Sequence, residues 1–346
     1  LTEFRDRVGA NAALESLQAD IEAGKKIEVR RLNARQGAAL AVYVPAAALI
    51  TRTDDDVASV YFVLALALDP DLHEARALWA QSLEKAGRRD EAIAVLSRIP
   101  ETSPFYASAR GQIAWAMRRQ GRDDEAVRLA RDAIAKSPDR GLKVQLADLY
   151  RSLARNEEAD RLLSEIIADD AREGRTDWHL LFARGAAREA LDRWPEAEAD
   201  LKDALVLQPD DPTVLNYLGY AYVNRGINLE EGLNLIRTAL THDPDSGFIT
   251  DSLGWAYYRL GRYELATYFL ERAVELEPGD PTLNDHLGDA YWRTDRKLEA
   301  KYQWERSLKL DPAEQERARI EVKLLKGPDA PVVVQAESQA PLPHRP

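Results

Sequence analysis

The side chains able to perform acid–base or metal chemistry are few and scattered. The sequence has five histidines and lacks cysteine, so it offers no thiolate nucleophile and no sulfur ligand for zinc. His286 and Asp289 are three residues apart and would share one helix face, but two ligands do not make a metal site. No HExxH motif, phosphate-binding glycine loop or nucleophile elbow occurs. We therefore expect no cofactor, metal or catalysis, and interpret His286 and Asp289 as part of a polar helix surface.

Aromatic and arginine side chains indicate a different chemistry, the binding of another protein. Trp255, Tyr258 and Trp292 are difficult to explain by packing alone, because other residues already provide an apolar core in their segments. Tryptophan, tyrosine and arginine are the residue types most enriched at the centres of protein interfaces. The residues that we expect to form the core there are Leu253, Tyr257, Leu287 and Tyr291.

Composition and net charge exclude several classes of protein and of partner. The 346 residues are 45% hydrophobic and 31% charged, which supports a folded core and excludes wholesale disorder. The net charge of −12 repels phosphate backbones, so nucleic acid is not an expected partner. The longest apolar stretch, residues 38–50, contains Pro45 and is shorter than the about 20 residues of a membrane-spanning helix. We expect a buried helix there and no transmembrane segment.

The elements that position these residues repeat along the chain. Short apolar strings end in proline at Pro209, Pro244, Pro278 and Pro312, which are 34 or 35 residues apart. Within one period, residues 247–278 show apolar positions every three or four residues on both sides of Gly261, which favours helix, turn, helix. Glycines recur midway along the first helix, which indicates close helix crossing. Small residues recur early in the second helix at Ala58, Ala92, Ala126, Ala159, Ala197, Ala266 and Ala300.

The string LGWAYYRLGRYELATYFLERAVELEP resembles the tetratricopeptide repeat almost residue for residue. The resemblance implies an all-α, right-handed superhelical solenoid of about eight repeats over residues 37–312. The repeats begin near residues 38, 73, 107, 140, 178, 212, 247 and 281. Residues 178–312, with the string DSLGW, further resemble bacterial cell-envelope proteins of this family, including lipoprotein adaptors of carboxyl-terminal processing proteases. That resemblance implies a location in the periplasm or cell envelope, with any lipid anchor outside this chain; a cytoplasmic location is the alternative.

Both ends of the sequence depart from the repeat. Residues 1–36 are interpreted as an amphipathic helix, compatible with part of a truncated preceding repeat, followed by a polar connector. The chain begins with Leu1 rather than methionine, so we expect a mature or trimmed form. Residues 313–326 are expected to form a polar capping helix, and the proline-rich residues 327–346 a disordered tail. Val332–Val334 within the tail would alternatively lie along a partner or in the protein's own groove.

In a solenoid of this kind the first helix of each pair lines the concave face. We expect a partner-binding groove there on the last three repeats, and a second set of groove residues on earlier repeats. The groove residues are Asn216, Tyr220, Asn224, Asp251, Trp255, Tyr258, Arg259, Asp285, Asp289, Trp292 and Arg293, and the second set is Trp115, Arg118, Arg119, Arg151 and Phe182. Asn216, Asn224, Arg259 and Arg293 have side chains suited to hydrogen bonds with the backbone of an extended peptide.

The leading hypothesis is a non-enzymatic scaffold or adaptor that binds a protein or an extended peptide, with an envelope protease or an assembly factor as the expected partner. One alternative is an RNA-binding helical repeat, which needs a basic face with stacking aromatics; here Asp251, Asp285 and Asp289 interrupt the arginines. Another is the regulatory arm of an enzyme whose catalytic part lies outside this chain. The sequence does not indicate an oligomeric state.

Overall fold

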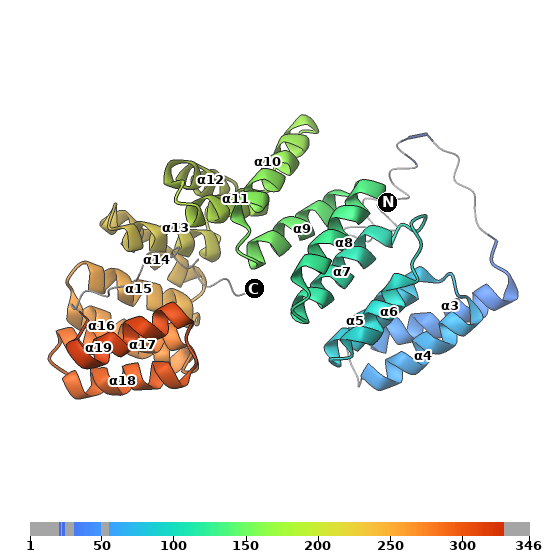
Figure 1. The fold of residues 1–346 in the computed structure, drawn as a ribbon. Helices are drawn as coiled ribbons and strands as arrows, with labels where there is room; N and C mark the ends of the chain where they lie inside the picture. Colours follow the sequence, from blue (N-terminus) through green and yellow to red (C-terminus); the bar gives the residue numbers. More distant parts are fainter. Residues whose placement is uncertain (1–20, 22, 25–30, 50–54, 329–346) are drawn as a thin grey trace. The chain divides into compact units, whose positions relative to one another are not determined.

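The computed structural model describes residues 21, 23–24, 31–49 and 55–328, and within these residues all regular structure is α-helical (Figure 1). The helices are α3 (Ala34–Leu49), α4 (Asp55–Leu68), α5 (His73–Lys85), α6 (Arg89–Ser97), α7 (Tyr106–Arg119), α8 (Asp123–Lys136), α9 (Arg140–Ser152), α10 (Asn156–Arg172), α11 (Trp178–Ala190), α12 (Trp194–Leu207), α13 (Pro212–Arg225), α14 (Leu229–His242), α15 (Gly247–Arg259), α16 (Tyr263–Leu276), α17 (Pro281–Arg293), α18 (Lys297–Lys309) and α19 (Glu314–Lys326). The amphipathic helix predicted at the start of residues 1–36 and the tail predicted for residues 327–346 lie almost entirely outside the described residues.

Successive helices pack in pairs, namely α3 with α4, α5 with α6, α7 with α8, α11 with α12, α13 with α14, α15 with α16 and α17 with α18, and α19 packs on the last pair through α18. In the C-terminal part, α13 packs on α14, α15 on α16 and α17 on α18, and the first helices α13, α15 and α17 also contact one another in sequence. This arrangement confirms the all-α repeat fold that the 34-residue period predicted. The superhelical course and handedness of the whole chain stay a prediction.

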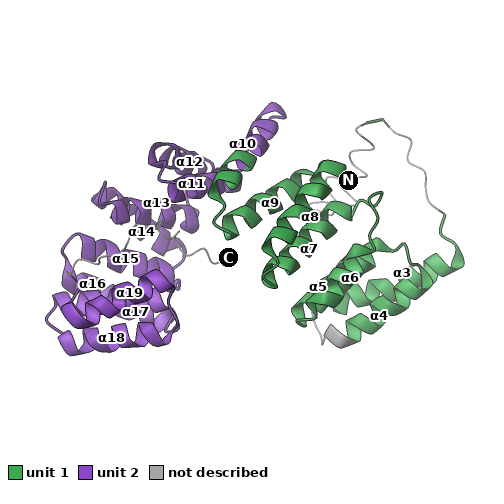
Figure 2. Ribbon diagram, viewed as in Figure 1, with its two compact units in different colours: residues 1–162 green, residues 163–346 purple. Residues whose placement is uncertain are grey.

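The chain separates into two compact units, residues 1–162 and residues 163–346, with the division inside α10 (Figure 2). Each unit has its own apolar clusters. We describe the units separately, and the residues of greatest interest lie in the second, which we call unit 2.

Helix starts follow from local capping chemistry. The first helices α13 and α17 begin after Asp211 and Asp280, whose carboxylates accept hydrogen bonds from backbone N–H groups of the first turn. At the start of α3, the side chain of Asn33 accepts from the backbone of Gln36 at 2.9 Å, and the Gln36 side chain accepts from the backbone of Asn33 at 3.2 Å. This reciprocal pair is a capping box. It starts α3 at Ala34, inside the segment that the sequence analysis assigned to a connector.

The turn within a helix pair requires one residue with left-handed backbone. Gly261, between α15 and α16, has φ = 72°, and Asp295 takes the same role between α17 and α18 with φ = 62°. Glycine adopts this conformation without strain, and aspartate is among the residues that tolerate it.

The recurring mid-helix glycines lie where two helices touch. A Cβ atom on Gly219 would lie 2.8 Å from the backbone oxygen of Gly232 in the partner helix α14. One on Gly288 would lie 2.4 Å from Nε1 of Trp304. The recurring alanines of the second helices, such as Ala266 and Ala300, are fully buried. The expectation of close helix crossing is confirmed.

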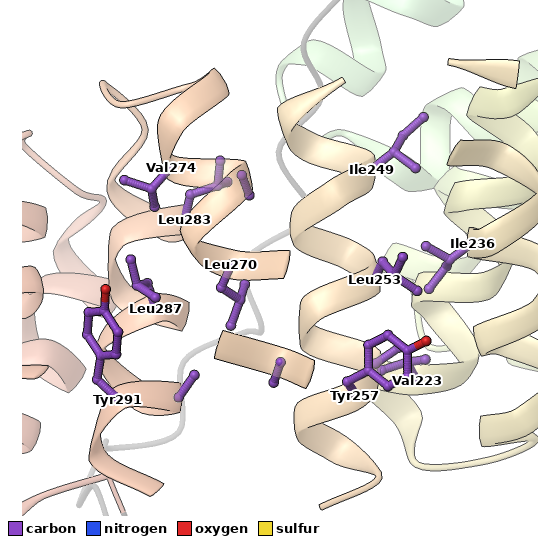
Figure 3. Close-up of a cluster of buried hydrophobic side chains, with 14 of the residues drawn as sticks. Val223, Ile236, Ile249, Leu253, Tyr257, Leu270, Val274, Leu283, Leu287 and Tyr291 are labelled. Carbon is purple, nitrogen blue, oxygen red and sulfur yellow. The ribbon is translucent and has the colours of Figure 1, made fainter. Parts of the chain in front are cut away.

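The core of unit 2 runs along the interior of α13 to α19 (Figure 3). It contains the four residues that the sequence analysis assigned to it, Leu253, Tyr257, Leu287 and Tyr291, all buried. Ile320 of α19 is 1% exposed and belongs to the same cluster, so α19 is packed as an integral helix. The core therefore extends past the last repeat.

The expectation of a buried helix at residues 38–50 is wrong. In α3 only Ala39 and Ala46 are buried, and Val44 is 62% exposed. Within the described part of the chain, α3 packs on α4 and α5, which cover only one side of it. Among the described residues, no helix combines the length and apolar character that a membrane span needs.

Candidate protein-binding face

The groove residues predicted in unit 2 all lie on first helices of their pairs, and we call them the first-helix face. They come from α11 (Phe182), α13 (Asn216, Tyr220, Asn224), α15 (Asp251, Trp255, Tyr258, Arg259) and α17 (Asp285, Asp289, Trp292, Arg293). Residues at matching positions of successive first helices therefore form rows across the face.

The central feature of this face is a stack of three rings. Trp255 lies between Tyr258 and His286, with ring centroids 4.8 Å and 4.1 Å away and interplanar angles of 7° and 15°. Stacked aromatic pairs add about 0.5–1.5 kcal/mol beyond the area they bury. Trp255 and Tyr258 remain half-buried, so these rings both support the fold and reach the surface.

The arginines of the face connect neighbouring repeats. Arg259 donates from Nη1 to the backbone oxygen of Asn224 at 3.0 Å, and Arg293 donates from Nε to the hydroxyl of Tyr258 at 3.1 Å. Each of these bonds joins a first helix to the first helix before it. Their role in binding a partner stays a prediction.

Two polar atoms of the face are buried and lack a hydrogen-bond partner among the described residues. They are Oδ1 of Asn216 on α13 and Nε1 of Trp255 on α15. Between them in sequence lies Tyr220, whose pKa is raised by burial and by the carboxylates of Asp251 and Glu316. Leaving a buried donor or acceptor unpaired costs about 1–3 kcal/mol. We call Asn216 and Trp255 the unpaired part of the face.

On α17 the carboxylates of Asp285 and Asp289 both have partners. Lys323 of α19 donates from Nζ to both carboxylate oxygens of Asp285, at 2.8 and 2.7 Å, and to Oδ2 of Asp289 at 2.8 Å. Asp289 also accepts from Nε1 of Trp304 at 3.1 Å. Trp292 packs against Gly327, where a Cβ atom would lie 2.7 Å from the indole ring. We call Asp285, Asp289 and Trp292 the paired part of the face.

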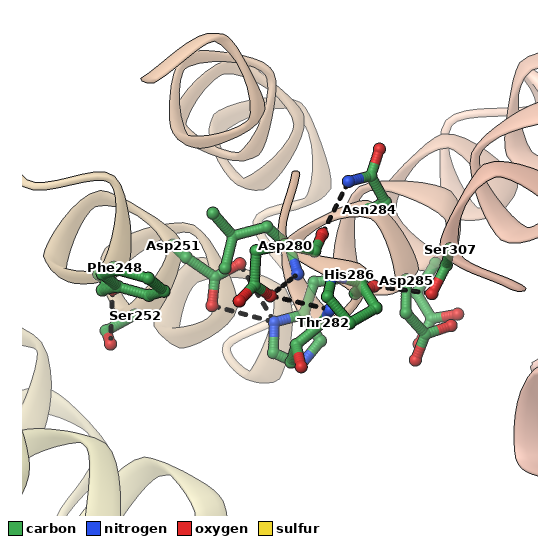
Figure 4. A network of polar contacts seen from close by, with 12 residues as sticks. Phe248, Asp251, Ser252, Asp280, Thr282, Asn284, Asp285, His286 and Ser307 are labelled. Carbon is green, nitrogen blue, oxygen red and sulfur yellow. Dashed lines mark hydrogen bonds and ion pairs between the residues drawn. The ribbon is translucent and has the colours of Figure 1, made fainter. Parts of the chain in front are cut away.

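The expectation that His286 and Asp289 form a polar helix surface is wrong. His286 is 8% exposed and Asp289 4% exposed. Nδ1 of His286 lies 3.0 Å from both carboxylate oxygens of Asp251, one pair back in the stack (Figure 4). The 35-residue separation of this pair follows the repeat period, and that period was the available signal for the contact. No such signal pointed to Lys323, because α19 lies outside the repeat.

The second set of predicted residues is divided between the two units. Trp115, Arg118 and Arg119 lie on α7 and Arg151 on α9, all in the first unit, whereas Phe182 lies in unit 2. Arg118 donates to Oδ1 of Asp123 at 3.3 Å, and Arg119 pairs with Glu84. Arg151 donates to Asp148, also at 3.3 Å, and Phe182 meets Tyr217 edge to face at 5.3 Å.

No three histidine, aspartate or glutamate side chains among the described residues are grouped as metal ligands. The chemistry of the first-helix face is that of stacking, hydrogen bonding and paired charge.

The paired helices and their small-residue crossings define an all-α helical-repeat protein. Family models described as tetratricopeptide repeat match residues 77–140, 182–246 and 251–280. These residues therefore form tetratricopeptide repeats, as the sequence strings indicated, and this repeat fold supports a protein–protein interaction scaffold.

Two relatives match about half of the chain. A TPR repeat-containing protein of Pseudomonas aeruginosa is 29% identical over 160 residues, which are 46% of this chain and 27% of that protein. The human protein O-mannosyl-transferase TMTC1 is 28% identical over 163 residues, which are 46% of this chain and 18% of that protein. The matched region spans less than a third of either relative.

Solved structures show the same fold. A tetratricopeptide repeat protein from Parabacteroides merdae has a TM-score of 0.60 at 16% identity and covers 73% of this chain and 97% of its own. The hetero-tetramer Cut9–Hcn1 of the APC/C has a TM-score of 0.58 at 17% identity, covering 85% of this chain and 57% of the matched one.

Proposed function

We propose that the first-helix face of unit 2 binds an extended segment of a partner protein, and that its unpaired part makes the central contacts. The observation that carries this proposal is the pair of unpartnered buried atoms, one acceptor on Asn216 and one donor on Trp255. A peptide group supplies one donor and one acceptor, which matches this pair. Both residues are half-buried, so they lie where the core meets the surface.

The ring stack supports the same proposal. Trp255 and Tyr258 keep part of their surface exposed while their orientation is fixed by stacking and by Arg293. A preordered aromatic surface loses little conformational entropy when a ligand binds, which is a property of interface hot spots. In contrast, Asp285 and Asp289 already hold Lys323.

An arrayed library of short unstructured peptides tests this proposal with the full chain. Three proteins are compared: wild type, the double variant Asn216→Ala/Trp255→Phe, and the control Tyr302→Ala, which changes a 63% exposed ring on the second helix α18. We expect binding by wild type and the control, and at least about tenfold weaker binding by the double variant, since each hydrogen bond to a ligand contributes about 1 kcal/mol. Equal binding by the three proteins would show that the peptide binds at another surface.

We further propose that the chain works without catalysis in the bacterial cell envelope, where it recruits or activates a protease or an assembly factor. This finer proposal is supported by the resemblance of residues 178–312 to envelope adaptors. Fractionation of the untruncated protein in its source cell, followed by capture on wild type and on the double variant, tests it. Recovery in the cytosolic fraction would reject the location, and equal capture by both proteins would reject the assigned face.

A further inference from the structure

The exposed side of α4, in the first unit, consists of apolar side chains. Every exposed residue in the described part of this helix is apolar. Val60 is 59% exposed and Leu64 50% exposed, although a helix that is apolar on nearly all sides is normally buried. The exposed residues, which we call the α4 stripe, are Val57, Val60, Tyr61, Val63, Leu64 and Ala67.

The matching surface of another second helix is charged. Ala58 of α4 corresponds to Ala126 of α8, two periods later in the sequence. Helix α8 packs on α7 and on α9, so it has helix neighbours before and after it, and its outer positions still stay exposed. A further repeat in front of α3 would therefore leave the α4 stripe exposed as well. The α8 residues at the positions of Val57, Val60, Val63 and Leu64 are Glu125, Arg128, Arg131 and Asp132.

The chain that precedes α3 enters beside the α4 stripe. Nη2 of Arg35, at the start of α3, donates to the backbone oxygen of Ala67 at 3.1 Å, so α3 begins next to the C-terminal end of α4. Residues 22–33 separate Ile21 from α3. A chain of this length reaches up to about 40 Å, whereas a helix of the length of α4 spans about 21 Å. The whole α4 stripe is therefore within reach of Ile21 and the residues before it.

The first residues of the chain carry an apolar pattern that complements the stripe. Leu14, Leu17 and Ile21 recur at helical spacing, three and four residues apart. Ile21 is itself described and is 42% exposed, so this apolar side chain also lacks cover. We propose that residues 2–21 pack as an amphipathic helix on the α4 stripe and thereby bury the outer side of the first helix pair.

The size of the stripe favours this tethered segment over a second copy of the chain. One helix face about 21 Å long and about 10 Å wide covers roughly 200 Å². A stable interface between separate proteins buries about 800 Å² on each partner. A segment of the same chain binds at a high effective concentration and needs far less contact area. The uncovered side of α3 is a poorer site, because Val44 is the one large apolar side chain exposed among its described residues.

Engineered disulfides test the contact directly, because the sequence contains no cysteine. Leu17→Cys is combined in the full chain with Val60→Cys or Leu64→Cys, and the protein is oxidised mildly at low concentration. Two controls combine Leu17→Cys with Arg128→Cys, at the matching position of α8, and with Val44→Cys on α3. We expect a disulfide within one chain to form at least about tenfold faster with a stripe cysteine than in either control, because groups held in contact have a high effective concentration.

The other outcomes of this experiment would overturn the proposal. A disulfide found only at the mass of a dimer would assign the α4 stripe to a second copy. Faster linkage to Val44→Cys would place residues 2–21 at the end of the stack. Equal rates with Arg128→Cys and with the stripe cysteines would show that the segment does not pack on α4.

Hydrogen exchange gives a second test that needs no cross-link, since it reports local opening. In the full chain, Leu14→Glu/Leu17→Glu replaces two apolar side chains of the segment by carboxylates, which are costly to bury. We expect exchange of α4 to become at least about tenfold faster, with little change in α7 and α8. The control Leu298→Glu, at an 82% exposed position of unit 2, should leave α4 unchanged. Unchanged exchange of α4 in the double variant would contradict the docking. The inference goes beyond the proposed function, because it concerns the first unit and does not depend on the first-helix face.

Discussion

Two parts of the first-helix face of unit 2 differ in whether their buried polar side chains have hydrogen-bond partners. In the paired part, Asp285 and Asp289 share Lys323, and Asp289 also receives a hydrogen bond from Trp304. In the unpaired part, Asn216 and Trp255 each bury a polar atom with no partner among the described residues. Unpaired buried groups are rare in folded proteins, and each one requires an explanation. We interpret the paired part as maintaining the fold, and we propose that the unpaired part binds a ligand.

The largest expected effect comes from removing Trp304, the buried ring of α18 that donates to Asp289 in the paired part. Trp304→Ala deletes a side chain with no exposed surface, which packs under Gly288 and donates to Asp289. Truncations of this kind cost about 3–5 kcal/mol. A urea titration followed by hydrogen exchange of α15 to α18 measures the loss. A loss below about 1 kcal/mol would show that the paired part does not anchor unit 2.

A smaller effect tests whether the helices beneath the unpaired part are tightly packed. Gly219→Ala places a methyl group 2.8 Å from the backbone oxygen of Gly232. Overpacking costs about 1–3 kcal/mol, and the better helix propensity of alanine offsets about 1 kcal/mol. We expect a net loss of about 1 kcal/mol in the same urea experiment. A gain in stability would mean that the region is loosely packed, and that its unpaired atoms need no functional explanation.

The smallest expected change is in the stability of Asn216→Ala. Removing an acceptor that has no partner relieves a cost, so the free energy of unfolding should stay within about 0.5 kcal/mol of wild type or increase. Thermal unfolding of the two proteins, side by side, measures the difference. A decrease above 1 kcal/mol would reveal that Asn216 has a structural partner and would remove it from the unpaired part.

Much of this fold was predictable from the sequence because the same pattern of residues recurs in each repeat. The small residues, helix pairs and core positions such as Leu253 and Tyr291 recur with the period, so each repeat supports the assignment of the others. The period also places His286 one repeat beyond Asp251. The contact was nevertheless not predicted, because a single polar pair on a helix is more often exposed.

What could not be predicted depends on contacts outside the period. Lys323 lies on α19, after the last repeat, and only the packing of α19 brings its ammonium group to Asp285 and Asp289. The sequence could not predict the unpaired atoms of Asn216 and Trp255 either, because whether an atom has a partner depends on all the groups around it in the folded chain. Burial and hydrogen-bond satisfaction are three-dimensional properties, and a residue type does not reveal them.

One measurement tests the central contrast most directly, a matched pair of tryptophan-to-phenylalanine substitutions. Trp255→Phe and Trp304→Phe each remove an indole N–H and keep a ring, but only Trp304 donates to another side chain, Asp289. For each variant, thermal stability and binding to the peptide array are measured with the full chain. We predict that Trp304→Phe lowers stability by about 1–3 kcal/mol, whereas Trp255→Phe keeps its stability and binds about fivefold more weakly. Equal losses of stability in the two variants, or undiminished binding by Trp255→Phe, would contradict the division of the face into a structural part and a binding part.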